Sequence, residues 1–319
     1  MKSLSVIVLA LVPVAFVILL GVLAGRRGLI SPKKSEVLAA LALDFCLPAL
    51  LFAATAVMTL PELENWQFFL GIALGLLSIY VIALGLALTA FRQPAAASSL
   101  QALNSAFPNM AFMGVPVLMA VIGKSAVLSV VIGNLISSFV LLPLTLTLLE
   151  AGKARSPGKN GAPAQSGMVV VWKSIFAALK QPLVWAPLAG IVMALCRVPL
   201  PEVAAKSLDL IGTATSGVAL FALGLVLSGQ KLRIGVAALV NTCFKMLAQP
   251  LVMLLLAILL GVTGVYRREM ILLGALPTAS MTAMFAVEYD TYVAESDATI
   301  LLSTILSLAT LGICIALTA

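Results

Sequence analysis

Apolar residues fill most of the chain in stretches of about twenty, and short breaks of polar residues, glycine and proline separate one stretch from the next. An α-helix of about 20 apolar residues is long enough to cross the roughly 30 Å hydrocarbon core of a bilayer. The stretches predict helices over residues 4–25, 36–58, 66–90, 98–122, 126–149, 174–196, 203–228, 234–261, 269–288 and 297–318. The pattern therefore predicts an all-α membrane protein of about ten transmembrane helices.

The long polar stretch Glu150 to Gly167 is rich in Gly, Pro, Ala and Lys, a composition typical of flexible linkers. It divides the predicted spans into two sets of five. We therefore expect a first five-helix repeat over residues 1–150, a cytoplasmic linker over 151–172 and a second five-helix repeat over 173–319.

The two sets of spans are related in sequence at a constant separation of 169 residues, without gaps. Matching residues at this separation include the pairs Pro13 and Pro182, Gly21 and Gly190, Pro32 and Pro201, Phe52 and Phe221, and Pro108 and Pro277. An odd number of spans in each set makes the second set enter the membrane from the opposite side. Such inverted repeats are common in secondary transporters, whose substrate site lies near the bilayer midplane between the repeats.

The fourth and ninth spans are each predicted to break at a proline, which removes a helix donor and obstructs a carbonyl one turn back. The break exposes backbone N–H groups and the positive end of a helix dipole, which can hold a carboxylate without an intramembrane arginine. Amide and hydroxyl side chains around both breaks could add hydrogen bonds. The predicted site for a small organic anion consists of Asn104, Pro108, Asn109, Pro277, Thr278, Ser280 and Thr282.

Asp44 in the second span and Lys245 in the eighth are the charges placed deepest in apolar sequence. A charge inside a span is costly to bury and is by default a functional hypothesis. Both residues are expected at a comparable depth, so we predict that they meet. Two roles are possible for this pair: it is either a structural ion pair or a group that couples transport to a proton or to substrate.

Composition and charge exclude several classes of function. With 62% hydrophobic and 10% charged residues, the chain has too little polar material for a soluble protein. Its net charge of +7 comes from residues scattered between spans, which argues against a nucleic-acid partner. The chain has no His, which excludes His-based catalysis and His-ligated metals. We expect no cofactor or metal, with coupling to H⁺ or Na⁺ left open.

The distribution of Lys and Arg predicts the orientation in the membrane. With the N-terminus outside, the predicted inside loops hold twelve Lys and Arg residues and the outside segments six, so both termini are predicted outside.

Two separated motifs carry a family resemblance. The first motif is Phe107-Pro-Asn-Met-Ala-Phe-Met-Gly-Val-Pro-Val-Leu118, which resembles the fourth helix of the auxin efflux carrier family. The second resembles the ninth helix of that family and consists of Ala275-Leu-Pro277, followed by Phe285-Ala286 and Glu288-Tyr289. The family includes bacterial proteins described as malonate transporters. The resemblance implies that these helices cross at their prolines beside the anion, in the inner membrane of a bacterium. Thr278 stands where the plant carriers have Gln, which argues against an aromatic, auxin-like substrate.

The sequence therefore predicts a secondary transporter that moves a mono- or dicarboxylate, such as malonate, across the cytoplasmic membrane by alternating access, and not an enzyme. The expected partners are the small anion and the lipid bilayer, and a homodimer stays open. Two alternatives also remain open at this stage: a membrane receptor or assembly subunit without transport, and an intramembrane enzyme that uses buried carboxylates.

Overall fold

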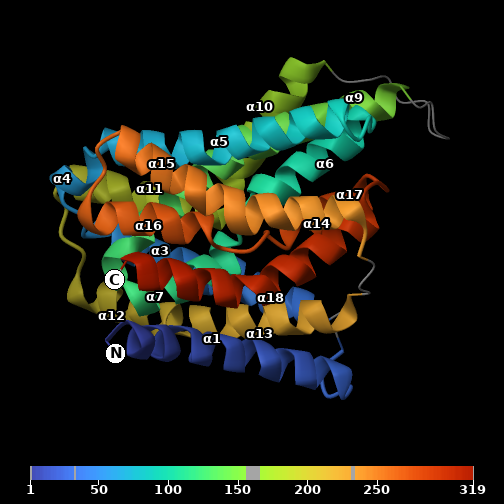
Figure 1. Cartoon of the computed structure of the whole chain (residues 1–319). Helices are drawn as coiled ribbons and strands as arrows, with labels where there is room; N and C mark the ends of the chain where they lie inside the picture. The colour runs from blue at the N-terminus through green and yellow to red at the C-terminus, as the bar shows by residue number, and fades with distance from the viewer. Residues whose placement is uncertain (1, 32–33, 156–165, 231–233, 319) are drawn as a thin grey trace.

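A computed structural model describes residues 2–31, 34–155, 166–230 and 234–318, and these residues form helices that run mostly along one direction (Figure 1). The expected first repeat contains α1 (Lys2–Arg26), α2 (Ser35–Ala40), η2 (Leu41–Cys46), α3 (Leu47–Ala56), α4 (Leu60–Leu63), α5 (Trp66–Thr89), α6 (Ala95–Ala106), η3 (Met110–Gly114), α7 (Val115–Val121), η4 (Lys124–Ala126), α8 (Val127–Ile136), η5 (Ser137–Leu141) and α9 (Leu142–Arg155). The second contains α10 (Gly167–Lys180), α11 (Pro182–Leu195), α12 (Glu202–Gly212), α13 (Ala214–Gly229), α14 (Val236–Cys243), η6 (Phe244–Ala248), α15 (Gln249–Leu259), α16 (Gly264–Gly274), α17 (Met281–Glu288) and α18 (Val293–Thr318).

The observed helices agree with the predicted all-α membrane class. Over the described residues, seven helices are long and apolar enough to cross a membrane, and the bent pair α10 and α11 makes an eighth. The remaining two predicted spans are those interrupted at Pro108 and Pro277. The two ends of the chain lie on the same side of the molecule (Figure 1).

The sixth predicted span, 174–196, is not one straight helix. The chain bends by 68° between α10 and α11. Gln181, which precedes Pro182, has extended backbone angles because the proline ring disfavours a helical residue before it. The predicted linker is also partly helical, since α9 extends to Arg155 and α10 begins at Gly167, while residues 156–165 lie outside the described part of the chain.

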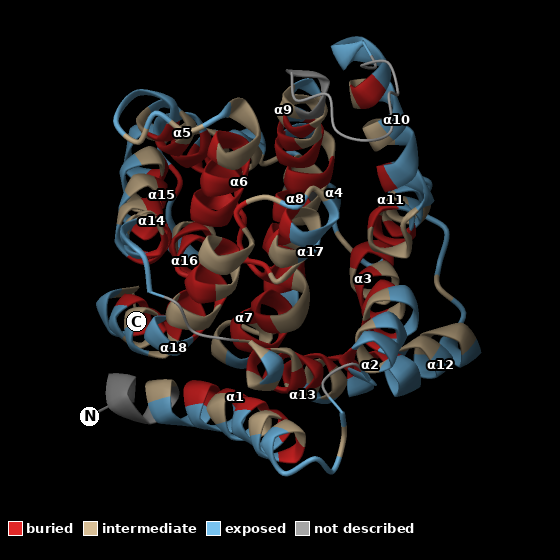
Figure 2. Ribbon diagram, turned by 90° about the vertical axis from the view of Figure 1, so that its right-hand side faces the viewer, coloured by how far each residue is buried: buried red, intermediate tan, exposed pale blue. Residues whose placement is uncertain are grey.

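The helices form two groups in space, and both repeats contribute to each group. The edge group consists of α1, α2, η2, α3, α11, α12 and α13, which pack mainly against one another. The crossover group consists of α5 to α9 and α14 to α18. In Figure 2 the edge group follows the bottom and right of the molecule, and the crossover group fills the left and centre. The groups meet where α13 contacts η3, α1 contacts α7 and α18, and α3 contacts α8.

Two glycines related by the repeat allow equivalent helix pairs in the edge group to approach closely. A Cβ at Gly21 of α1 would collide with the Phe221 carbonyl of α13, and a Cβ at Gly190 of α11 would collide with the Phe52 carbonyl of α3. Small residues permit this close approach of helix backbones in membranes. The same contact therefore occurs twice, between residues that occupy matching positions of the two repeats.

Candidate substrate site at a helix crossover

The breaks in the fourth and ninth spans lie against each other. Pro108 and Thr278 form an antiparallel bridge, in which the Asn109 N–H donates to the Pro277 carbonyl at 2.7 Å and the Ala279 N–H donates to the Phe107 carbonyl at 2.9 Å. Unwound backbone is tolerated at membrane depth only where other groups satisfy it. Each broken helix therefore supplies hydrogen-bond partners for the other.

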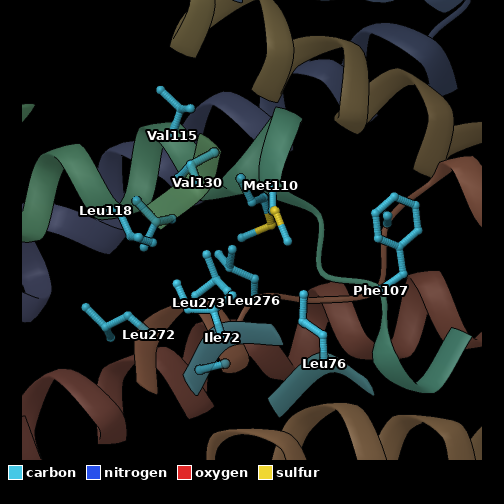
Figure 3. Packing of buried hydrophobic residues seen from close by; sticks show 14 of the residues in the cluster. Ile72, Leu76, Phe107, Met110, Val115, Leu118, Val130, Leu272, Leu273 and Leu276 are labelled. Carbon is cyan, nitrogen blue, oxygen red and sulfur yellow. The ribbon is translucent and has the colours of Figure 1, made fainter. Parts of the chain in front are cut away.

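Buried apolar side chains surround this crossing. Phe107, Met110 and Leu276 belong to one buried cluster with residues of α5, α7, α8 and α16 (Figure 3). Leu76 of α5 and Leu273 of α16 lie in the same cluster. The crossing segments are thus held by a packed apolar layer, which keeps the polar groups of the site in a fixed arrangement.

Asn104 organises part of the predicted site from its position in α6, because all its side-chain groups are used within the protein. Its backbone carbonyl accepts from Thr278 Oγ1 at 2.8 Å, and its Oδ1 accepts from Thr282 Oγ1 at 2.9 Å. Its Nδ2 donates to the Leu100 carbonyl and to Ser296 Oγ, each at 2.8 Å. Asn104, Thr278 and Thr282 therefore brace α6 against the ninth span in this conformation.

Two other predicted residues keep polar atoms unused. Asn109 accepts the Phe112 N–H at 3.2 Å through Oδ1, as the residue that begins η3, while its Nδ2 is buried without a hydrogen-bond partner. The Ser280 hydroxyl beside the other break is also buried without a partner. Buried polar groups normally find partners, so each exception requires an explanation. A bound solute that accepts hydrogen bonds would explain both.

The predicted pairing of Asp44 with Lys245 is wrong. Among the described residues the two form no ion pair: Asp44 is exposed in η2 of the edge group, whereas Lys245 is fully buried in η6 of the crossover group. Lys245 Nζ instead donates to Gln249 Oε1 and, at 3.1 Å, to the Gly274 carbonyl. Equal depth in two spans did not bring the residues together, because the spans belong to different groups.

Gln249 completes a contact that the sequence analysis missed. Its Nε2 donates to the carbonyl of Ala106, the last residue of α6, at 2.8 Å. Gly274, which accepts from Lys245, is the last residue of α16. Lys245 and Gln249 therefore cap the negative ends of both broken helices just before they cross. The available signal was the spacing of four residues, which places both polar side chains on one helix face.

A second polar cluster joins α6, α14 and α18, and the sequence did not predict it either. Asn241 of α14 accepts from Ser105 Oγ at 3.3 Å and donates to Thr299 Oγ1 and to the Tyr292 hydroxyl, each at 3.2 Å. Burial raises the pKa of Tyr292, so its hydroxyl stays neutral. Gln101 in α6 is fully buried, and neither polar atom of its side chain has a partner. A glutamine inside an apolar span was the signal for this residue.

The electrostatics of the crossing favour an anion. Lys245 and Gln249 satisfy the negative ends of α6 and α16, while η3 and α17 begin at the crossing and direct their positive ends toward it. Over the described residues, no cluster of three or more His, Cys, Asp or Glu side chains could hold a metal ion. The site therefore consists of neutral donors and helix ends.

Comparison with known proteins identifies the family. The sequence model of the family described as "Membrane transport protein" matches residues 6–315, nearly the whole chain. The chain belongs to this family of membrane transporters. The prediction of a transporter and not an enzyme is thereby confirmed, and the intramembrane-enzyme and non-transporting alternatives are set aside.

Three relatives illustrate the range of the family. "Uncharacterized transporter YfdV" of Escherichia coli K12 is 28% identical over 302 residues, which cover 92% of this chain and 91% of the relative. "Putative malonate transporter" of Rhizobium meliloti is 26% identical, covering 83% of this chain and 81% of the relative. "Auxin efflux carrier component 3" of Arabidopsis thaliana is 29% identical over 44% of this chain and 23% of that protein. The expected resemblance to auxin efflux carriers is confirmed.

Proposed function

We propose that this transporter carries a small organic carboxylate, with a dicarboxylate such as malonate as the first candidate, and binds it at the crossing of the fourth and ninth spans. The observation that carries the proposal is that each break has a buried polar atom without a partner, Nδ2 of Asn109 at one and the hydroxyl of Ser280 at the other. A carboxylate accepts hydrogen bonds from both kinds of group. The similarity to a protein described as a malonate transporter supports the same substrate class.

The two helix groups suggest how the carboxylate would cross. The crossing lies in the crossover group and faces the edge group through the contact of η3 with α13. Movement of one group against the other would expose the site to each side in turn, as in other transporters with inverted repeats. We place the protein in the inner membrane of a bacterium with both termini outside, on the excess of Lys and Arg in the predicted inside loops.

The first test is the thermal stability of the purified protein in the presence of mono- and dicarboxylates. A ligand that binds only the folded state stabilises it by about 2.7 kcal/mol at a concentration of 100 times Kd. We expect one carboxylate class to raise the unfolding midpoint. Amines and neutral solutes should have no effect, and a shift with these solutes alone would contradict the proposal.

Asn109→Ala should abolish or greatly weaken this shift. The chain offers a matched control in Asn65, which begins α5 and accepts the Phe68 N–H at 3.2 Å, as Asn109 accepts the Phe112 N–H. Both alanine variants lose the same helix-capping bond, so their difference reports on Nδ2 of Asn109. Loss of a hydrogen bond to a charged group costs about 1.5–3 kcal/mol, or roughly 10- to 150-fold in affinity. Unchanged carboxylate affinity in Asn109→Ala would remove this residue from the site.

Uptake into proteoliposomes then measures transport and its driving force. We expect saturable uptake of the carboxylate that gives the thermal shift, and an imposed proton gradient or Na⁺ gradient identifies the coupling ion by which of them accelerates uptake. Uptake that rises linearly with concentration would show that the carboxylate is not a carried substrate.

A further inference from the structure

A groove of about 630 Å³ lies between α15, α16 and α18, away from the crossing. Most of its lining is apolar and includes Leu251 and Leu254 of α15 and Ile313 and Leu317 of α18. The groove reaches the end of α18, and therefore lies toward the side of the molecule where both termini emerge (Figure 1). A groove of this kind on a membrane protein is a suitable place for acyl chains.

Two adjacent arginines give this groove a charge that its other lining residues do not balance. Arg267 and Arg268 of α16 both line it, and no acidic residue does. Arg267 Nε donates to the Val262 carbonyl at 2.9 Å, while Arg268 Nε is buried without a hydrogen-bond partner. Neither arginine forms an ion pair within the described residues. Two uncompensated guanidinium groups beside apolar surface favour an anionic ligand, and the planar guanidinium suits phosphate oxygens.

We propose that this groove binds one anionic phospholipid, with its phosphate on Arg267 and Arg268 and its acyl chains along α15 and α18. The combination of a basic end and an apolar length matches the two parts of such a lipid. A free phosphate would use only the basic end, and the apolar length would stay in contact with bulk lipid.

Another groove shows that apolar lining alone does not predict this ligand. The groove between α5, α8 and α11 has a volume of about 760 Å³ and is lined by Trp66, Phe69 and other apolar residues. Its charged lining residue is Glu64, and neither Lys nor Arg lines it. Acyl chains could occupy this groove, but an anionic headgroup would be repelled. Of these two grooves, the one that Arg267 and Arg268 line is therefore expected to prefer an anionic lipid.

The groove also adjoins the helices that hold the crossing. Met246, which lines it, follows Lys245, and α16 runs from the two arginines to the Gly274 carbonyl that Lys245 caps. A lipid bound here would therefore contact η6 and α16, the elements that include Lys245 and Gly274. The lipid proposal does not depend on the identity of the substrate.

The test is native mass spectrometry of the full chain in detergent with added phosphatidylglycerol or phosphatidylcholine. We expect one phosphatidylglycerol to bind in preference to phosphatidylcholine. The double variant Arg267→Gln with Arg268→Gln should lose about fivefold in affinity for each arginine, or about thirtyfold together. The matched control is Arg197→Gln, because Arg197 is an exposed arginine outside the groove.

A second variant tests the apolar part without changing charge. Thr310 lines the groove, and Thr310→Trp should fill it and weaken phosphatidylglycerol binding while both arginines remain. This variant also keeps the proposal testable if the double arginine variant does not fold. Equal binding of both lipids, or unchanged phosphatidylglycerol binding in Thr310→Trp, would overturn the proposal. Competition by glycerol phosphate at the same concentration as the lipid would show that the groove binds a free anion instead. If the protein forms a dimer without lipid and Thr310→Trp dissociates it, a second copy of the chain covers the groove.

Discussion

At the scale of single residues, the burial of Lys245 depends on carbonyl groups and not on a carboxylate. Its Nζ contacts Gln249 and the last carbonyl of α16, and Gln249 in turn contacts the last carbonyl of α6. Helix C-terminal ends carry partial negative charge and unsatisfied carbonyls. Lys245 and Gln249 therefore supply donors to two helix ends that meet because both helices are broken.

This arrangement predicts different effects for the two charges that the sequence pattern had paired. Lys245→Met should lower the free energy of unfolding by about 1–3 kcal/mol, because the Gly274 carbonyl loses its donor. Asp44→Asn should leave it unchanged or raise it, because Asp44 forms no ion pair with Lys245 among the described residues and a neutral amide is less costly than a carboxylate inside a span. Thermal unfolding of the purified variants measures both effects.

The double variant decides whether the two residues interact. If Asp44 and Lys245 are independent, the effects of the single variants should add to within about 0.5 kcal/mol. A double variant clearly more stable than that sum would show that the two charges meet and that our account of Lys245 is wrong.

At the scale of helices, close packing in the edge group depends on positions without a side chain. Gly21 allows α1 to reach α13, and its repeat mate Gly190 allows α11 to reach α3. Hydrophobic burial does not drive helix association within lipid, so backbone proximity and van der Waals contact carry more of the stabilisation. The same glycine-to-carbonyl contact therefore occurs in both helix pairs.

We predict that Gly21→Ala and Gly190→Ala each destabilise the protein by about 1–3 kcal/mol, because an added methyl group forces two helix backbones apart. The matched control is Gly85→Ala in α5, where an added Cβ has no atom within 4 Å. Alanine favours helix more than glycine does, so the control should be neutral or stabilising by up to about 1 kcal/mol. Unfolding midpoints in detergent compare the three variants, and equal midpoints for Gly21→Ala and Gly85→Ala would contradict the packing argument.

At the scale of the whole molecule, an exposed ion pair joins the two groups at their surface. Lys124 Nζ of η4 in the crossover group lies 3.4 Å from Asp209 Oδ1 of α12 in the edge group. Both side chains are more than half exposed, and such pairs contribute about 1 kcal/mol or less. The pair is weak enough to break when the groups move.

Cross-linking this pair should therefore stop transport. In a variant without the four native cysteines, a short bismaleimide that joins Lys124→Cys to Asp209→Cys should abolish carboxylate uptake. The matched control joins Glu202→Cys to Lys206→Cys, a pair one helical turn apart within α12, where Lys206 Nζ and Glu202 Oε1 are 2.7 Å apart. Uptake should persist in the cross-linked control. Full uptake after complete cross-linking of the first pair would show that transport does not need the two groups to separate.

The sequence alone determined the class of this protein, the approximate spans and the two breaks. Those features depend on local properties: a span needs about 20 apolar residues, and a proline removes a backbone donor wherever it lies. The bend before Pro182 has an equally local cause, but the apolar run across it concealed the change of direction.

Only the tertiary structure decided which polar groups are used and which are available. Asn104 and Asn109 are the same residue type five positions apart. The side chain of Asn104 forms hydrogen bonds with Leu100, Thr282 and Ser296, whereas Nδ2 of Asn109 has no hydrogen-bond partner. Lys245 contacts the Gly274 carbonyl and not Asp44, because the spans of Lys245 and Asp44 belong to different groups. The physical reason is that hydrogen-bond partners inside a membrane come from neighbouring helices, and depth along a span does not reveal which helices are neighbours.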